Sequence, residues 1–188
     1  IADPSSYDYS VSGSTNPEFP NLSLVTGYDD LYAFTLTDAE GNYTFYYKDA
    51  GDYIILPWPF YYNAIGWFTL PSILEVYVDD DNSVLTDQDF TLTQGNANIE
   101  GFVFDNNGAP APNINLQINS TENNDGPGLF TMTSTNSEGY YNVSVLGDMC
   151  WVSYVNQSPN YMMSNNNSNN GIICPVPGET VLADDIIV

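Results

Sequence analysis

The sequence repeats itself at a distance of about half its length of 188 residues. The segment from Thr37 to Tyr43 (TDAEGNY) is similar to the segment from Thr135 to Tyr141 (TNSEGYY), which lies 98 positions later. Two further matches occur in the same order: PNLSL at 20–24 with PNINL at 112–116, and VLTD at 84–87 with VLAD at 181–184. Three matched blocks in one order indicate two copies of one domain. We predict domains over residues 1–94 and 95–188.

Both halves have the residue alternation of β-strands. Tyr7, Tyr9 and Val11 alternate with polar residues, and so do the apolar residues of segments 22–24 and 114–118. The Glu-Gly pairs at 40–41 and 138–139 separate strand-like segments, where glycine supplies the positive φ of a tight turn. Helical periodicity is absent. The expected fold class is therefore all-β, with two immunoglobulin-like β-sandwiches in tandem.

The charge balance excludes several classes of function. The chain has 24 Asp and Glu residues, no His and a single cation, Lys48, which gives a formal net charge of -23. Binding to nucleic acid or to anionic lipid requires cationic side chains, and acid–base catalysis by His is impossible. We expect no enzymatic activity, no cofactor, no nucleic-acid partner and no insertion into a membrane. In a strongly acidic medium most of the carboxylates would be neutralised.

Two features indicate a secreted protein. Cys150 and Cys174 suit one disulfide in an oxidising compartment, and a pair of buried thiols is the alternative. A first residue other than Met suggests a removed signal peptide. Six Asn-x-Ser/Thr sequons predict surface N-glycosylation: they begin at Asn21, Asn42, Asn119, Asn142, Asn156 and Asn166.

The second half resembles a known family of domains. The segment from Ile99 to Pro110 (IEGFVFDNNGAP) and the hairpin segment at 135–141 are similar to the carboxypeptidase-regulatory-like, or transthyretin-like, β-sandwich. In the first half, Tyr9 takes the place of the family glycine and Asn16-Pro17-Glu18 replaces the Gly-x-Pro turn. This resemblance implies a sandwich fold and a structural or adhesive role in place of catalysis.

The architecture and composition together resemble the subunits of thread filaments made by thermoacidophilic archaea. That resemblance implies a pilin-like protein that polymerises head to tail by donor-strand complementation. Residues 1–12, with Tyr7, Tyr9 and Val11, are the candidate donor strand, because a strand on a flexible lead can pair with a neighbour's sheet. The alternative is an ordinary first strand that folds into its own domain.

The segment from Leu56 to Leu70 is aromatic and uncharged. It suggests a subunit interface or a sugar-binding platform, with the domain core as the alternative. The interface candidates are Trp58, Phe60, Tyr61, Trp67 and Phe68.

Lys48 lies in an aromatic strand, where a buried amine could condense with an Asn or Asp side chain to form an isopeptide bond. The alternative is a surface lysine. The acidic turn Asp79-Asp80-Asp81-Asn82 offers oxygen ligands for Ca²⁺, although a solvated hairpin fits it better and no metal site is predicted.

These features predict the structural subunit of an extracellular filament, such as a pilus or thread, with other copies as partners and adhesion or biofilm formation as its use. Other cells or surfaces are further candidate partners. The alternative is a glycan- or surface-binding tandem β-sandwich module of an adhesin.

Overall fold

The computed structural model describes residues 6–16, 21–28, 31–57, 66–121, 129–155 and 171–188. It confirms the all-β fold class, because the elements of the described residues are β-strands joined by turns. No helix in the described ranges is long and apolar enough to cross a membrane.

The chain divides into two compact units. Unit 1 comprises residues 1–59 and 69–93, and unit 2 comprises residues 60–68 and 94–188. The division at Thr93 and Gln94 lies one residue from the boundary predicted from the repeat. The assignment of residues 60–68 to unit 2 differs from the predicted domain ranges, and its physical reason is the position of Phe68, described below.

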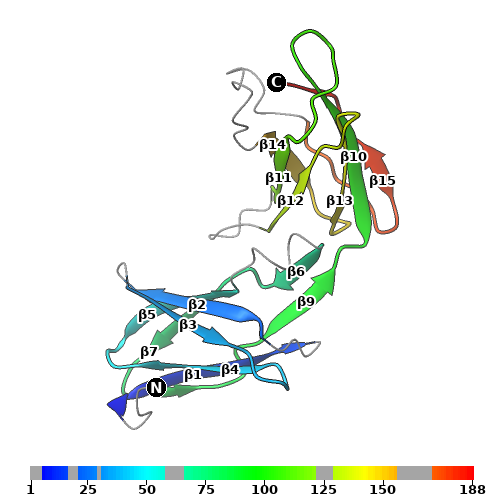
Figure 1. Cartoon of the computed structure of the whole chain (residues 1–188). Coiled ribbons are helices and arrows are strands. Elements are labelled where there is room, and N and C mark those ends of the chain that lie inside the picture. The colour runs from blue at the N-terminus through cyan, green and yellow to red at the C-terminus, as the bar shows by residue number, and fades with distance from the viewer. Residues whose placement is uncertain (1–5, 17–20, 29–30, 58–65, 122–128, 156–170) are drawn as a thin grey trace. The chain divides into compact units, whose positions relative to one another are not determined.

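Unit 1 is a sandwich of two sheets (Figure 1). In one sheet, β1 pairs antiparallel with β4 on one side and parallel with β8 and β9 on the other. The second sheet has the order β3-β2-β5-β7. The strands are β1 (Tyr9–Asn16), β2 (Ser23–Tyr28), β3 (Leu31–Leu36), β4 (Asn42–Tyr47), β5 (Gly51–Pro57), β7 (Leu74–Val78), β8 (Val84–Leu85) and β9 (Phe90–Gln94); β6 (Trp67–Leu70) pairs with β9 and crosses the division between the units.

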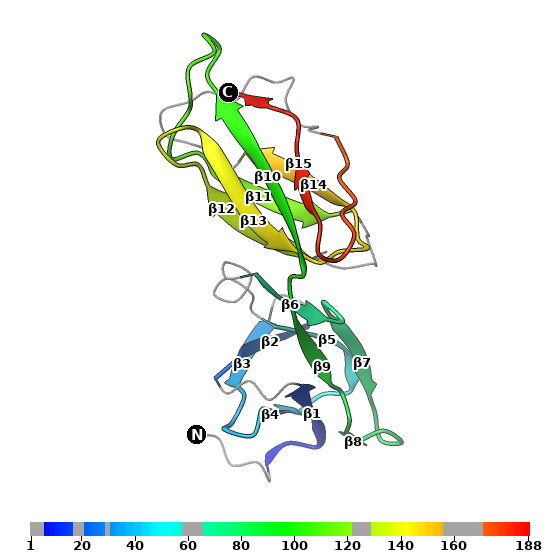
Figure 2. The ribbon, with the colours of Figure 1, turned by 90° about the vertical axis from the view of Figure 1, so that its right-hand side faces the viewer.

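The described strands of unit 2 pair in the same order as those of unit 1, except that none corresponds to β6 or β7 (Figure 2). β10 pairs antiparallel with β13 and parallel with β15 and β16, as β1 does with β4, β8 and β9. β11 lies between β12 and β14, as β2 lies between β3 and β5. The strands are β10 (Ala97–Phe104), β11 (Asn115–Ser120), β12 (Phe130–Ser134), β13 (Tyr140–Val145), β14 (Trp151–Val155), β15 (Thr180–Leu182) and β16 (Ile186–Ile187).

The matched sequence blocks form matched turns. The hydroxyl of Thr37 accepts a hydrogen bond from the backbone N–H of Leu22 at 2.8 Å, and that of Thr135 accepts one from Ile114 at 2.9 Å. Both threonines are buried. The following Gly41 and Gly139 have φ of 83° and 71°, which glycine adopts without steric cost. The Thr-x-x-x-Gly pattern thus builds the same turn twice.

The strand register corrects one residue assignment. Val11 is opposite Phe45 in β4, and Ile99 is opposite Val143 in β13, so β1 and β10 are offset by 88 residues. The family glycine, Gly101, therefore corresponds to Gly13 and not to Tyr9. The Tyr9 assignment was wrong because the connection between the first two strands is four residues shorter in unit 1, where it comprises residues 17–22, than in unit 2, where it comprises residues 105–114.

Candidate assembly site

Strand β1 occupies a central position in its sheet. Ser10 donates its backbone N–H to the carbonyl of Ser83 at 2.9 Å, and the carbonyl of Ser12 accepts from Gln88 at 3.2 Å. On the opposite side, Thr15 donates its N–H to the carbonyl of Gly41 at 3.0 Å. Both edges of β1 are therefore hydrogen-bonded within the same chain.

The inward side of β1 is complementary to the core. Val11 is fully buried, and Thr15 is 2% exposed. Between them, a Cβ atom on Gly13 would lie 1.9 Å from the carbonyl oxygen of Gln88, so only glycine fits there. These contacts position the strand by packing and by backbone hydrogen bonds, with no ion pair needed.

A carboxylate fixes the end of β1. The side chain of Asp89 accepts hydrogen bonds from the backbone N–H of Ser14 at 2.7 Å and from its hydroxyl at 2.9 Å. At the other end, the hydroxyl of Tyr9 donates to Asp80 at 3.0 Å, and this hydrogen bond raises the tyrosine pKa. Sequence reasoning missed Asp89 and Asp80, because nothing in their local sequence indicates a partner more than seventy residues away.

In this single chain, the candidate donor strand pairs within its own sheet. The ring of Tyr7 lies 6.0 Å from that of Tyr46, on the neighbouring strand β4. Exchange of β1 between copies is a separate question, taken up as a proposal below.

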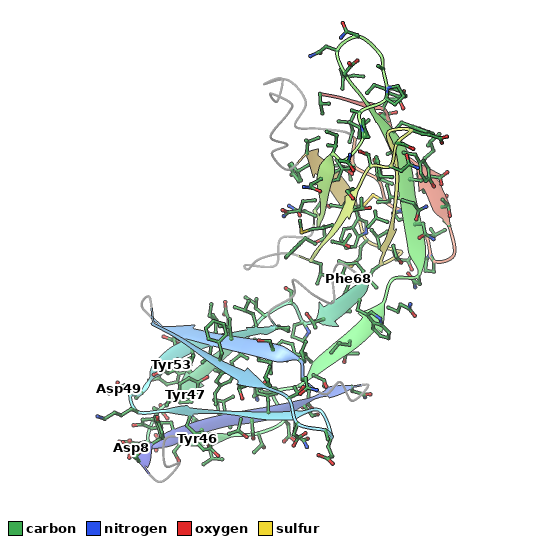
Figure 3. All side chains as sticks on the ribbon, viewed as in Figure 1. Asp8, Tyr46, Tyr47, Asp49, Tyr53 and Phe68 are labelled. Carbon is green, nitrogen blue, oxygen red and sulfur yellow. A yellow bond between two sulfur atoms is a disulfide. The ribbon has the colours of Figure 1, made fainter. Side chains whose placement is uncertain are left out.

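Aromatic side chains fill the core at the same end of unit 1 (Figure 3). The rings of Tyr47 and Tyr53 are 4.0 Å apart. Because the hydroxyl of Thr26 donates to the carbonyl of Ile54, the hydroxyl of Tyr47 donates to Thr26 at 2.9 Å. Burial raises the pKa of Tyr47 to about 12, so this phenol stays protonated at any physiological pH.

The prediction that Phe68 belongs to an exposed interface was wrong. Its side chain is fully buried in the core of unit 2, with its ring 5.4 Å from that of Trp151. The backbone carbonyl of the nearby Gly66 accepts from Gly95 at 2.7 Å, which ties this segment to unit 2. Trp67 is partly exposed, whereas Trp58, Phe60 and Tyr61 lie outside the described residues.

Lys48 follows β4 directly and is exposed. The strand alternates between buried Tyr43, Phe45 and Tyr47 and outward-facing neighbours, and Lys48 continues the outward series. An isopeptide bond of the predicted kind needs an enclosed amine, so this position favours the alternative of a surface lysine.

The acidic segment at 79–82 forms a closed turn. The side chain of Asp79 accepts hydrogen bonds from the backbone N–H groups of Asp81 at 3.0 Å and Asn82 at 2.8 Å. This is the hairpin that the sequence favoured over a calcium loop. Among the described residues, no group of three or more His, Cys, Asp or Glu side chains could hold a metal ion.

Four of the six sequons lie in described residues. Asn21, Asn42 and Asn142 are exposed, at a turn, at the start of β4 and on β13. Asn119, on β11, is partly buried, and its side-chain oxygen accepts from Gln117 at 2.9 Å. Asn156 and Asn166 lie outside the described residues. Attachment of glycans stays a prediction at all six positions.

The predicted disulfide is confirmed. Cys150 and Cys174 are bonded to each other and leave no free cysteine. The bond lies beside β14, next to the pairing of Trp151 with Ile173. It therefore connects the start of this strand to the segment paired with it.

No family model and no curated protein matches this chain. Among solved structures, it is similar to a TIE protein of Bacillus anthracis at 14% identity and TM-score 0.38, covering 97% of this chain and 34% of that one. A streptococcal ancillary pilin has 12% identity and TM-score 0.40, with 94% and 62% covered. GBS52, the minor pilin of Streptococcus agalactiae, has 11% identity and TM-score 0.41, with 95% and 94% covered.

The chain thus spans 34% and 62% of the first two of these structures. TM-scores below 0.5 do not establish a shared fold. The description of the chain as a tandem of β-sandwich units therefore rests on its own strand pairing.

Proposed function

We propose that this protein is the structural subunit of an extracellular surface filament, in which copies join head to tail by exchanging strand β1. Adhesion to cells or surfaces, or biofilm formation, is the use we assign to such a filament. The observation that carries the proposal is the place of β1. It is a central strand of its sheet, yet it is the first of the described strands, and residues 17–22 connect it to β2.

A strand with this connectivity can be exchanged without threading. If β1 of one copy leaves its sheet, β4 on one side and β8 and β9 on the other present the same hydrogen-bonding groups to β1 of the next copy. The equivalent strand of unit 2, β10, is connected to β9 and β11 and cannot leave in this way. Exchange therefore gives each copy one donor and one acceptor.

The charge of the chain supports this kind of contact. With 24 carboxylates and one side-chain cation in each chain, an interface between two copies has very few salt bridges available to it. Strand exchange needs only backbone hydrogen bonds and apolar side chains such as Val11. The disulfide supports an oxidising, extracellular location.

Locking β1 in its own sheet tests the proposal. Ser10 and Tyr46 are directly opposite each other in the antiparallel β1–β4 pair, so the double variant S10C/Y46C can form a disulfide there. The matched control is F102C/Y140C, on the opposed residues of β10 and β13. Mass spectrometry verifies each bond, and electron microscopy with sedimentation at acidic and neutral pH measures polymer.

We expect wild-type protein to form filaments, oxidised S10C/Y46C to remain unpolymerised and its reduced form to polymerise. The F102C/Y140C control should polymerise in both redox states. Filaments from oxidised S10C/Y46C would overturn strand exchange. If the wild-type protein stays monomeric at both acidic and neutral pH, the proposal that this chain is a filament subunit is itself overturned.

A further inference from the structure

One outer sheet face of unit 2 carries aromatic rings beside a predicted glycosylation site. The outward-facing residues of β10 alternate with buried ones and include Glu100, Phe102 and Phe104, which are partly exposed. On the neighbouring strand β13, Tyr140 is opposite Phe102 and Asn142 is opposite Glu100, so both lie on the same side of the sheet. We call Phe102, Phe104 and Tyr140 the aromatic platform.

The rings of the aromatic platform adjoin one another. The Phe102 ring lies 5.4 Å from the Tyr140 ring. It is stacked on the Phe104 ring at 6.1 Å, with 18° between the ring planes. These are the distances of interacting aromatic pairs. The three rings therefore form one contiguous apolar patch, and such patches mark contact surfaces, whereas scattered apolar residues do not.

Asn142 lies at the edge of this platform. The hydroxyl of Tyr140 donates to the carboxylate of Glu100 at 2.8 Å and accepts from the side-chain amide of Asn142 at 3.4 Å. The hydrogen bond to Glu100 raises the pKa of Tyr140, so the phenol stays protonated at neutral pH. The amide nitrogen that would carry a glycan is thus within hydrogen-bonding distance of the platform. A sugar replaces one hydrogen on that nitrogen and leaves the other available to Tyr140.

The repeat supplies an internal comparison. In unit 1, Ser14 occupies the position of Phe102 and Asn42 occupies that of Tyr140, since the two pairs are matched in register. The side chain of Asn42 donates instead to the carboxylate of Asp38 at 3.3 Å. The same sandwich therefore forms without rings at these two positions. Asn42 also begins a sequon, so it is a matched glycosylation site without a platform.

The chemistry of the face favours a sugar as its occupant. A pyranose has faces of C–H groups, which bury apolar area against an aromatic ring and are attracted by its negative π face. Its hydroxyl groups donate hydrogen bonds, and the Glu100 carboxylate has further acceptor positions beside the one that Tyr140 uses. A second copy, with 24 acidic residues and one side-chain cation, has little to pair with this carboxylate. A neutral sugar does, and the sequon at Asn142 is on the same face.

We propose that a glycan on Asn142 packs its first sugar against Tyr140 and Phe102 and is thereby a structural part of unit 2. The proposal rests on the glycosylation predicted at this sequon and is independent of strand exchange. It separates Asn142 from Asn42, which is opposite Ser14 and has no ring there to cover. Because the sugar removes ring surface from water, losing it should lower the stability of unit 2.

NMR of the glycosylated chain tests the proposal. The protein is made in a eukaryotic cell, an endoglycosidase trims each glycan to a single N-acetylglucosamine, and mass spectrometry of glycopeptides measures occupancy. Protons above an aromatic ring are shifted upfield, so we expect upfield sugar signals at Asn142, with nuclear Overhauser effects to Tyr140 and Phe102. The variant N142Q identifies these signals by their loss. The sugar on Asn42 in the same molecule is the control and should have the shifts of a solvated sugar.

Variants separate the rings from the hydrogen bonds. F102S introduces the residue type that unit 1 has at this position and should abolish the upfield shifts while Asn142 stays glycosylated. Y140F keeps its ring and should retain them. N142Q should lower the unfolding midpoint of unit 2 by about 4–8 °C, the range in which a domain of this size responds to the loss of one contact. In the F102S background N142Q should no longer do so, and N42Q should leave unit 2 unchanged.

An unoccupied Asn142, or sugar signals at Asn142 that match those at Asn42, would overturn the proposal, and neither result depends on a variant that folds. Titration of unglycosylated protein, made in a bacterium, with free N-acetylglucosamine adds a second arm. If that sugar shifts the signals of Phe102 and Tyr140 while Asn142 is found unoccupied, the platform is reassigned to glycans of another molecule. The filament test uses β1, so its failure and the failure of this proposal are distinguishable.

Discussion

The aromatic rings of Phe68 and Trp151 lie 5.4 Å apart, and both side chains are fully buried in the core of unit 2. Phe68 reaches this core from a segment that lies between strands β5 and β7 of unit 1. The core of unit 2 therefore includes a residue from outside the continuous stretch 94–188 that makes up most of the unit. Trp151 is fixed from another side, because its indole N–H donates to the carbonyl of Leu146 at 2.9 Å.

Replacing Phe68 by alanine should destabilise unit 2 by about 3–5 kcal/mol, the usual cost of removing a buried aromatic ring. Hydrogen exchange of the whole chain should show the loss of protection in β10–β14 and not in β1–β5. The control is L70A, which truncates an exposed side chain two residues away. Equal loss of protection in both units would contradict the assignment of Phe68 to unit 2.

Both turn threonines should contribute to the stability of their units. The hydroxyl of Thr135 accepts from the N–H of Ile114 and donates to the carbonyl of Ala111 at 2.7 Å, in a buried site. The variant T135V leaves both groups without a partner and should cost about 2 kcal/mol. T37V should have an effect of the same sign in unit 1, where Leu22 loses its acceptor.

Denaturant unfolding of the valine and serine variants measures these effects. The variants T135S and T37S keep the hydroxyl and should recover most of the lost stability. Serine variants as unstable as the valine ones would show that the methyl group, and not the hydrogen bonds, is what matters.

The turn beginning at Asp38 should be sensitive to pH, whereas its counterpart at Asn136 should not. Hydrogen bonds lower the pKa of Asp38, above all the one from the backbone N–H of Asn42. A lowered folded-state pKa means that the charged form stabilises the turn above the unfolded-state pKa. This contribution is lost as the pH falls through the folded-state value. Asn136 makes equivalent bonds with its neutral amide oxygen.

Thermal unfolding between pH 2 and pH 6, with NMR titration of the carboxyl groups, measures this difference. D38N should reduce the acid-dependent loss of stability, and N136D should add to it and introduce a carboxyl group with a lowered pKa. If D38N and wild type lose stability identically with falling pH, the turn makes no contribution to acid sensitivity.

Reduction of the Cys150–Cys174 disulfide should destabilise unit 2 by about 3 kcal/mol, because the bond closes a loop with a sequence separation of 24 residues. The double variant C150S/C174S should match the reduced wild type. Calorimetry with and without reductant checks this, and C150S/C174S should not respond to reductant at all. Unchanged stability on reduction would mean that the pairing of Trp151 with Ile173 holds the loop by itself.

Much of the architecture could be predicted from local sequence signals. The Thr-x-x-x-Gly pattern around Thr37 and Thr135 predicted matched turns, because glycine is required where φ is positive. Alternation placed Val11 on a buried side, and the two cysteines were paired correctly. The Tyr9 assignment failed because a sequence offset taken from one block does not hold across a loop of different length.

What the sequence determined by itself was composition and periodicity: an all-β chain, internally repeated, almost without cations. The tertiary structure decided which residues of similar character face the core and which face outward. Phe68 and Phe34 are both strand phenylalanines, yet the first is fully buried and the second is 65% exposed. Burial depends on which strands are brought together by long-range pairing, and that pairing joins residues too distant in sequence for any local pattern to record it.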